Sequence, residues 1–513
     1  MPHKPLDIIG NTAAWLTALS AACLALITVW FSRHQPIEMD LAMMHYSAFL
    51  INEKHLLLYR DIFENNLPGP FLFHSLIGQV FGYGAHPVRF LDALVLTGLA
   101  ILSWKIIGPI SRTSAVLAPA LFAFIYFAGG TVAAFQRDYI AILPVAAALA
   151  LLCCTPIHTQ RDAALVGALC GLACGFKPNF VVVLPALLWI IWAGATGGLI
   201  TKIQRVLIPA GITFTAIFSI PFFWALQHAD LKELLALYKT YTPLYVSTRS
   251  DLYHYDNREQ QLLDLVSMQA SHLAKMGMFA IPGLLWAWRQ HRDNPAAIIR
   301  LKFLALITFA IAWHEMIAGK YWLAHLLPPY FFTVLCFSLL LTPSKNKSSL
   351  FEKILRVFFV IVVGYFAVFL AGSYSSQIVY NKHYDAENHG IRSKKIARFL
   401  QQNMKPGDKV QSLDGSGDGQ GSLLLAHATT ATRFVEDIPL YLQPESPVTQ
   451  AFRREFMDSL TRNPPAYFLY IHNFFHPAGG NRLQEFKELN QFLQQHYNEA
   501  EMVDGEYTIY RRK

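Results

Sequence analysis

Apolar residues along this chain are gathered into long runs that short polar segments separate. A hydrocarbon core about 30 Å thick requires roughly 20 apolar residues in a helix, and runs of this kind recur from Thr12 to about Gly372. They lie near residues 10–31, 88–107, 114–131, 138–155, 163–175, 179–196, 206–225, 273–288, 299–316, 322–342 and 353–372. The pattern predicts a polytopic α-helical membrane domain over residues 1–372 with about eleven transmembrane helices.

The pattern changes after residue 372, where polar residues dominate. Residues 391–400 have helical periodicity, a turn is expected at 405–408, and short apolar strands are expected at 466–471 and 507–510. This alternation predicts a small, water-exposed α/β or α+β domain over residues 373–513. Its glycine-rich stretch, residues 414–421, lacks the acid that a calcium loop needs and the lysine of a phosphate loop, so we expect a flexible loop there.

Composition and charge exclude several classes of protein. The chain has 513 residues, of which 54% are hydrophobic and 15% charged, and its mean hydropathy is +0.32, which excludes an ordinary soluble enzyme. The net charge of +8 comes mostly from short loops between apolar runs, so we expect contact with membrane lipid and no nucleic-acid partner. All six cysteines fall inside predicted spans, which argues against a disulfide framework or a zinc site.

Charge also predicts the orientation of the chain. With a cytoplasmic N-terminus and an extracytoplasmic C-terminal domain, the short inner segments of the membrane domain are rich in cations, as the positive-inside rule requires. These cations are Lys4, Lys105, Arg112, Arg161, Lys202, Arg205, Arg289, Arg292, Arg300, Lys302, Lys345, Lys347, Lys353 and Arg356. The first run is longer than the apolar part of a cleaved signal peptide, so we expect it to be retained as a helix.

Two longer segments, residues 32–87 and 226–272, then lie outside. The apolar run 70–81 is too short to span and is expected to be an interfacial or re-entrant helix; counting it as a span would reverse the charge pattern. The second segment begins with an amphipathic stretch and becomes rich in tyrosine, which is typical of an interfacial belt or of an acceptor or sugar surface.

Three cations are exceptions in the short outer loops: Arg137, Lys177 and Lys320. Each alone could reach up to the interface as an ordinary snorkelling side chain. Because the three come from separate hairpins on one side, we interpret them as a basic site that faces an anion. His74, His325 and His314, with Glu315, are candidates for phosphate binding or proton transfer, or are ordinary interfacial groups.

Several short motifs occur in order along the outer segments. They are Glu38-Met-Asp40, the polar run 59–71 with its Asn65-Asn-Leu-Pro-Gly69 turn, Phe81-Gly82, Arg89-Phe-Leu-Asp92, Arg137-Asp138, Gly175-Phe-Lys177 and the stretch 320–329 that begins Lys320-Tyr321. In order and spacing they resemble the GT-C superfamily of membrane glycosyltransferases, in the branch of protein O-mannosyltransferases and bacterial lipid A aminoarabinose transferases. The resemblance covers the membrane part, and the C-terminal domain matches only in placement.

The resemblance implies a function and a set of site residues. It implies a GT-C-like fold in a bacterial inner membrane, with a periplasmic C-terminal domain and a polyprenyl-phosphate sugar as donor. Asp40 matches the family's catalytic carboxylate, although Leu41 follows where a glutamate is usual, and Glu38 is a neighbour of open role. Lys177, Arg137 and Lys320 would bind the donor phosphate. Candidates for other substrate contacts are Glu38, Asp138, His74, His325 and Tyr321.

Such a site predicts inverting transfer, because a base that activates the acceptor and a phosphate that leaves act on opposite faces of the sugar. We expect no cofactor, since no metal-ligand motif occurs, and the sequence leaves a divalent metal open. The acceptor is a lipid, a glycan or a protein. The alternatives are a flippase for a lipid-linked sugar, which would be expected to show paired halves, and a non-catalytic envelope scaffold.

Overall fold

The computed structural model describes residues 4–33, 37–155, 158–248, 255, 257–344, 349–387, 390–472, 482–503 and 505–513. The chain divides into two compact units. The first, which we call the helix unit, comprises Met1–Arg33, Arg89–Ile220 and Asp264–Ile378. The second, the sheet unit, comprises His34–Val88, Pro221–Leu263 and Val379–Lys513.

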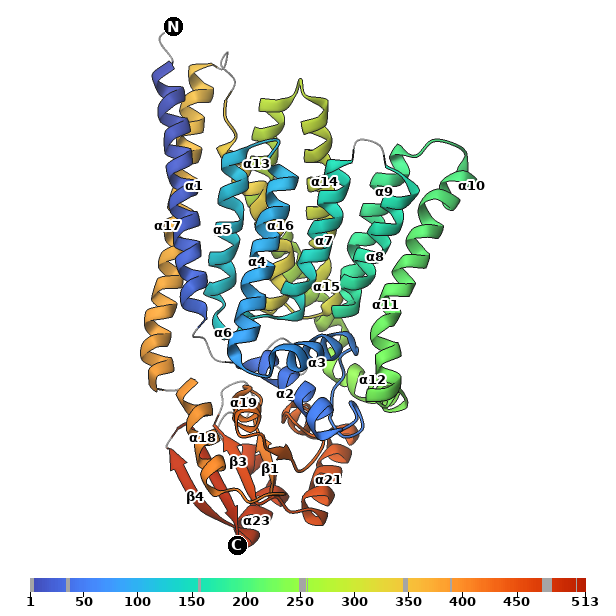
Figure 1. The fold of residues 1–513 in the computed structure, drawn as a ribbon, viewed down its shortest axis with the longest axis vertical. Coiled ribbons are helices and arrows are strands. Elements are labelled where there is room, and N and C mark those ends of the chain that lie inside the picture. The colour runs from blue at the N-terminus through green and yellow to red at the C-terminus, as the bar shows by residue number, and fades with distance from the viewer. Residues whose placement is uncertain are drawn as a thin grey trace. The chain divides into compact units, whose positions relative to one another are not determined.

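The helix unit is built from long apolar helices (Figure 1). A helix lying in lipid must satisfy its backbone internally and present apolar side chains, which explains its composition. The helices are α1 (Lys4–Ser32), α4 (Ala85–Ile107), α5 (Arg112–Ala128), α6 (Gly130–Ala133), α7 (Arg137–Cys154), α8 (Gln160–Phe176), α9 (Leu184–Gly194), α10 (Leu199–Lys202), α11 (Ile208–His228), α13 (Arg258–His291), α14 (Pro295–Ile311), α15 (His314–Ala318), α16 (Leu323–Ser338) and α17 (Leu350–Glu387). Helices α4, α11, α13 and α17 also contribute residues to the sheet unit. Short 3-10 turns, η1 (Pro178–Val183) and η3 (Leu339–Leu341), and a π-helical turn, η2 (Ile203–Leu207), join some of them.

The predicted membrane architecture agrees with these helices. Within the described residues, seven helical segments are long and apolar enough to cross a membrane. They are Gly10–Trp30, Ala85–Ile107, Arg137–Cys154, Leu199–His228, Pro295–Ala318, Leu323–Leu341 and Leu350–Gly372. The chain is therefore a multi-pass membrane protein. The four other predicted ranges fall on α5, α8, η1 with α9, and α13, and the total of eleven spans stays a prediction.

Glycines let helices of this unit approach closely. A Cβ atom on Gly167 or Gly171 of α8 would lie 2.1 Å from the carbonyl oxygen of Ala210 or 2.6 Å from that of Phe214, both on α11. A Cβ on Gly283 of α13 would lie 2.0 Å from the carbonyl oxygen of Cys336 on α16. In lipid the hydrophobic effect does not drive helices together, so their association depends on close packing. Small residues at these crossings allow the backbones to come into contact.

The sheet unit contains a five-stranded sheet in the order β2-β1-β3-β5-β4. Strands β1 (Lys409–Leu413), β2 (Thr429–Thr430) and β3 (Tyr467–Ile471) are parallel, and β5 (Tyr507–Arg512) runs antiparallel to β3 and to β4 (Tyr497–Val503). The helices of the unit are α2 (Met39–Lys54), α3 (Gly69–Phe81), α12 (Leu231–Val246), α18 (Gly390–Asn403), α19 (Asp418–Leu425), α20 (Ile438–Tyr441), α21 (Pro447–Arg462), α22 (Arg482–Glu485) and α23 (Lys487–His496). The predicted α/β character of the C-terminal region is confirmed, and the predicted strands correspond to β3 and β5.

The two long segments of the membrane region share the core of this sheet. Tyr46 and Phe49 of α2 are buried in one hydrophobic cluster with Leu400, Val410 and Ile509 of the C-terminal region. A second cluster joins residues of the segment before α3 and of α12 to β1, β3 and α21. The Tyr46 hydroxyl also donates to the carbonyl of Ala428 at 3.0 Å. Helix α2 is thus a core element of the sheet unit, and Figure 1 shows it beside α19.

Candidate functional site

Asp40 lies in the first turn of α2, within the sheet unit, and its side chain is half-buried. The positive end of the helix dipole favours a negative charge at this position. Glu38, the N-cap residue, is extended (φ −143°, ψ 173°) and makes no side-chain cap bond, and only 5% of it is exposed. The two carboxylates therefore have different surroundings, and Asp40 is the more accessible of them.

The glycine-rich stretch that follows β1 packs against this helix start. The prediction of a flexible loop is wrong, because residues 414–421 are all buried and α19 begins at Asp418. The Asp414 carboxylate accepts bonds from the backbone N–H of Ser416 and of Gly419, each at 2.7 Å. The backbone N–H of Met39 donates to the carbonyl oxygen of Ser416 at 3.0 Å. The glycines here serve close packing rather than mobility.

His74 lies on α3 and faces α2. Its Nδ1 is 3.3 Å from Nδ1 of His45, and both residues are buried. One of the two nitrogens must donate and the other accept, so the pair requires at least one neutral imidazole. Burial lowers the pKa of His45 from 6.5 to about 4. This geometry gives His74 a packing partner, and a substrate contact through it stays a prediction.

In the helix unit, Asp138 and Lys177 form a buried ion pair. The Lys177 ammonium donates to both carboxylate oxygens of Asp138, at 2.8 and 2.7 Å. Lys177 caps the C-terminal end of α8, and Asp138 lies in the first turn of α7. His314 Nε2 lies 3.4 Å from the same carboxylate. Arg137, which precedes Asp138, is half-buried. Two of the predicted site residues, from separate hairpins, are therefore in direct contact.

Lys320 and Tyr321 lie between α15 and α16, and His325 lies in the first turn of α16. Lys320 is 1% exposed, and its carbonyl oxygen lies 2.8 Å from Nδ1 of His325. Since a carbonyl only accepts, this contact places the proton of His325 on Nδ1. The Tyr321 hydroxyl donates to the side-chain oxygen of Gln269 at 2.8 Å. These contacts fix the orientation of the histidine ring and of the tyrosine.

Two further groups of buried polar side chains lie in the helix unit, and of their members only Glu315 was a candidate from the sequence. His272 Nε2 lies 2.5 Å from a carboxylate oxygen of Glu315. On α4, the Asp92 carboxylate accepts the Tyr126 hydroxyl at 2.9 Å, and Arg89 lies 3.7 Å away. Buried charges in a membrane domain are costly and usually serve a pathway or a ligand. Arg89 and Asp92 could have been found from the sequence, because they lie three positions apart at the start of an apolar run, a spacing that brings them together on one face of a helix.

Among the described residues, no three or more His, Cys, Asp or Glu side chains are grouped so that they could hold a metal ion.

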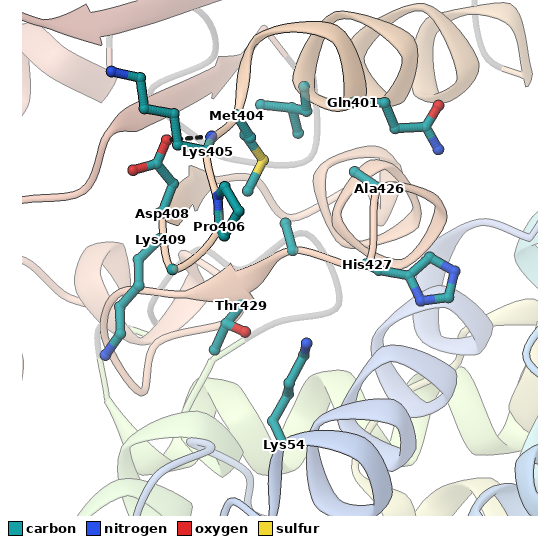
Figure 2. Close-up of a pocket in the computed structure, with 13 residues that line it drawn as sticks. Lys54, Gln401, Met404, Lys405, Pro406, Asp408, Lys409, Ala426, His427 and Thr429 are labelled. Carbon is teal, nitrogen blue, oxygen red and sulfur yellow. Dashed lines mark hydrogen bonds between the residues drawn. The ribbon is translucent and has the colours of Figure 1, made fainter.

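The described part of the sheet unit has a cavity of about 510 Å³ with residues of α2, α18 and the starts of β1 and β2 in its walls (Figure 2). Its charged lining residues are Lys54, Lys405, Lys409 and Asp408. Asp408 accepts the backbone N–H of Lys405 at 2.8 Å. The excess of positive charge suits an anionic group.

Comparisons with known proteins identify the fold. Residues 66–224 match the family model described as dolichyl-phosphate-mannose-protein mannosyltransferase. The crystal structure of ArnT from Cupriavidus metallidurans bound to undecaprenyl phosphate is similar over 96% of this chain and 97% of that one, with a TM-score of 0.57 and 13% identity. The apo form of that protein gives a TM-score of 0.54 at 12% identity, with the same coverage.

An oligosaccharyltransferase from Archaeoglobus fulgidus, tethered with an acceptor peptide, is also similar. Its TM-score is 0.51 at 12% identity, over 98% of this chain and 74% of that one. No curated protein sequence matches the chain significantly. At these identities the shared property is the fold. The chain therefore has an ArnT-like fold, and the predicted GT-C-like architecture is confirmed.

Proposed function

We propose that this protein is a membrane glycosyltransferase that moves a sugar from a polyprenyl-phosphate-linked donor to an acceptor hydroxyl or amine, with inversion. The observation that carries the proposal is the similarity to ArnT over nearly the whole of both chains. One of the ArnT structures contains undecaprenyl phosphate. The mannosyltransferase family model over residues 66–224 supports it independently. The outer face of a bacterial inner membrane is the proposed location, and the positive-inside pattern of the sequence supports this orientation.

Asp40 is the proposed catalytic base. Its carboxylate lies in the first turn of α2 and is only half-buried, as a base that must meet an acceptor requires. In the reaction it would take the proton of the acceptor hydroxyl or amine while that oxygen or nitrogen bonds to the anomeric carbon. The bond from the anomeric carbon to the phosphate oxygen would break in the same step, which inverts the configuration.

Lys177, Arg137 and Lys320 are the proposed phosphate ligands. A departing polyprenyl phosphate gains negative charge, and fixed cations in a site of low dielectric stabilise that charge more than water does. The Asp138 carboxylate fixes the Lys177 ammonium in position, and His325 bonds to the main chain of Lys320. Asp138 and His325 are thus proposed to act by orienting the cations, and Tyr321 and Glu38 remain candidate substrate contacts.

Transfer in proteoliposomes with a radiolabelled polyprenyl-phosphate sugar tests the proposal. Asp40→Asn should lower kcat by about 10² to 10⁴-fold, the usual contribution of a general base. Glu53→Gln is the matched control, because it removes an exposed carboxylate near the other end of the same helix. Full transfer by the Asp40→Asn variant would refute Asp40 as the base. Movement of the donor across the bilayer without transfer would indicate a flippase, and neither activity would favour a scaffold.

A further inference from the structure

The first residue of α2 has an unusual backbone conformation. Met39 has φ of 54°, in the left-handed region that side chains other than glycine seldom adopt. Such a conformation costs free energy and persists only where the surroundings impose it. Met39 directly precedes Asp40, and the side chain of the N-cap residue Glu38 makes no capping hydrogen bond. The start of α2 is therefore not held by a capping side chain of its own.

A turn of the C-terminal region makes the contact that holds it. The Met39 N–H donates to the carbonyl oxygen of Ser416 at 3.0 Å. Gly417 is itself left-handed, with φ of 86°, and a Cβ atom on it would lie 2.2 Å from the Met39 nitrogen and 2.8 Å from its Cα and carbonyl oxygen. A Cβ on Gly421 would lie 3.3 Å from the Ile37 carbonyl oxygen. Because these neighbours are backbone atoms, only glycine fits at position 417 without displacing the start of α2.

Buried acidic groups hold this turn in place. Asp414, which is fully buried, accepts the N–H and the hydroxyl of Ser416 and the N–H of Gly419, each at 2.7 Å. Asp418 is paired with Arg392 and accepts the Ser393 hydroxyl at 3.0 Å. A carboxylate that binds several donors of one turn fixes the backbone of that turn. The position of the Ser416 carbonyl is therefore set within the C-terminal region.

We propose that the turn of residues 414–417 positions Asp40 for catalysis, by holding Met39 in its left-handed conformation. Gly417 and Asp414 are positioning residues in this proposal, because they act through Met39 and touch no substrate. The inference rests on the proposed function of Asp40 as base. It adds that the C-terminal region completes the catalytic machinery and is not only a separate binding domain.

The test compares Gly417→Ala with Gly505→Ala. Gly505 has φ of 71°, and a Cβ atom there would meet nothing within 4 Å, so its variant imposes the same backbone strain without displacing a neighbour. A misplacement of about 1 Å at a reacting group can cost about 100-fold in rate. We expect Gly417→Ala to lower kcat about 10- to 100-fold with little change in KM for the polyprenyl-phosphate sugar. We expect Gly505→Ala to leave both constants unchanged.

Hydrogen exchange of the amides in the first turn of α2 is a second measurement. The exchange should be faster in Gly417→Ala than in wild type and unchanged in Gly505→Ala. If Gly417→Ala does not fold, Asp414→Asn replaces it, because an amide keeps the shape but cannot accept from all three donors. For Asp414→Asn we again expect kcat to fall while KM stays constant, and the fall should be smaller than in Gly417→Ala.

The outcomes separate this inference from the proposed function. Full activity of Asp40→Asn would overturn the function and with it the inference. If Asp40→Asn is inactive while Gly417→Ala has the kcat of Gly505→Ala, the inference is overturned and the function stands. A rise in KM without a fall in kcat would also overturn it, since a displaced base slows the chemical step rather than donor binding.

Discussion

Replacing Lys177 by methionine should destabilise the helix unit strongly. The side chain of Lys177 is 11% exposed and that of Asp138 is 1% exposed, and two bonds of 2.7 and 2.8 Å join them. Removal of one partner of a buried ion pair costs about 3–5 kcal/mol, because the other charge stays buried without compensation. His314 lies 3.4 Å from the Asp138 carboxylate and can offset part of that loss. We therefore expect about 3 kcal/mol, the lower end of the range.

The double variant Asp138→Asn with Lys177→Met separates stability from binding. Neutral replacement of both partners of a buried pair is often close to neutral for stability, so most of the loss should be recovered. If Lys177 is also a phosphate ligand, the affinity for a polyprenyl phosphate should stay low. The assays are denaturant unfolding in detergent micelles and titration with the lipid phosphate, combined as a double-mutant cycle.

Two results would refute this reasoning. A Lys177→Met protein whose stability stays within about 1 kcal/mol of wild type would show that the ion pair is not the buried, compensated pair that its geometry indicates. A double variant that regains both stability and lipid-phosphate affinity would remove Lys177 from the phosphate site and leave it a purely structural role.

Acidification and backbone crowding give two more tests. Between about pH 6.5 and 4 the unfolded chain takes up a proton on His45 that the folded chain does not, because burial lowers the pKa of His45 to about 4. Stability present above pH 6.5 should therefore fall by about 3 kcal/mol across that window, and His45→Phe should flatten the fall in unfolding free energy; a pH-independent unfolding free energy of wild type would contradict this. Gly283→Ala should cost about 1–3 kcal/mol, because its Cβ would lie 2.0 Å from the Cys336 carbonyl oxygen. Gly277→Ala on the same helix, whose Cβ would meet only the end of Ile281 at 3.5 Å, is the control, and equal unfolding midpoints for the two variants would contradict the packing argument.

The membrane helices could be predicted because lipid imposes one simple demand. A helix in a bilayer is apolar on nearly every side, so the runs of apolar residues mark α1, α4, α7, α11, α14, α16 and α17 directly. Strands β3 and β5 were also found, since each is a short apolar segment that follows a turn. Their signals are local in the sequence.

The assembly of the sheet unit could not be predicted in this way. The hydrogen bond between Tyr46 and Ala428 joins residues 382 positions apart, and no local pattern specifies such a contact. The glycine-rich stretch was interpreted as flexible because it lacks ligand residues, whereas Gly417 is there for its close approach to Met39. The signal that was available is a serine between two aspartates, Asp414 and Asp418, which is typical of a side-chain-bonded turn.

The sequence predicted which residues belong to the candidate site better than it predicted which of them are in contact. Asp138 and Lys177 were each named from the sequence, yet their pairing depends on the packing of α7 against α8. The pair of His272 with Glu315 was not predicted, because its two members lie in different helices. A motif gives the order of residues along the chain, and the fold decides which of them meet.

The long separation between α2 and its supporting turn has a consequence for biosynthesis. Asp40 leaves the ribosome early, whereas the C-terminal partners of α2 follow much later, as the 382 positions between Tyr46 and Ala428 show. At about 5–20 residues per second, that interval lasts roughly 20 to 75 s. During this time α2 has neither its hydrophobic partners from the C-terminal region nor the carbonyl that holds Met39. A nascent chain already inserted in the membrane would therefore stay inactive until its last region has been made and folded.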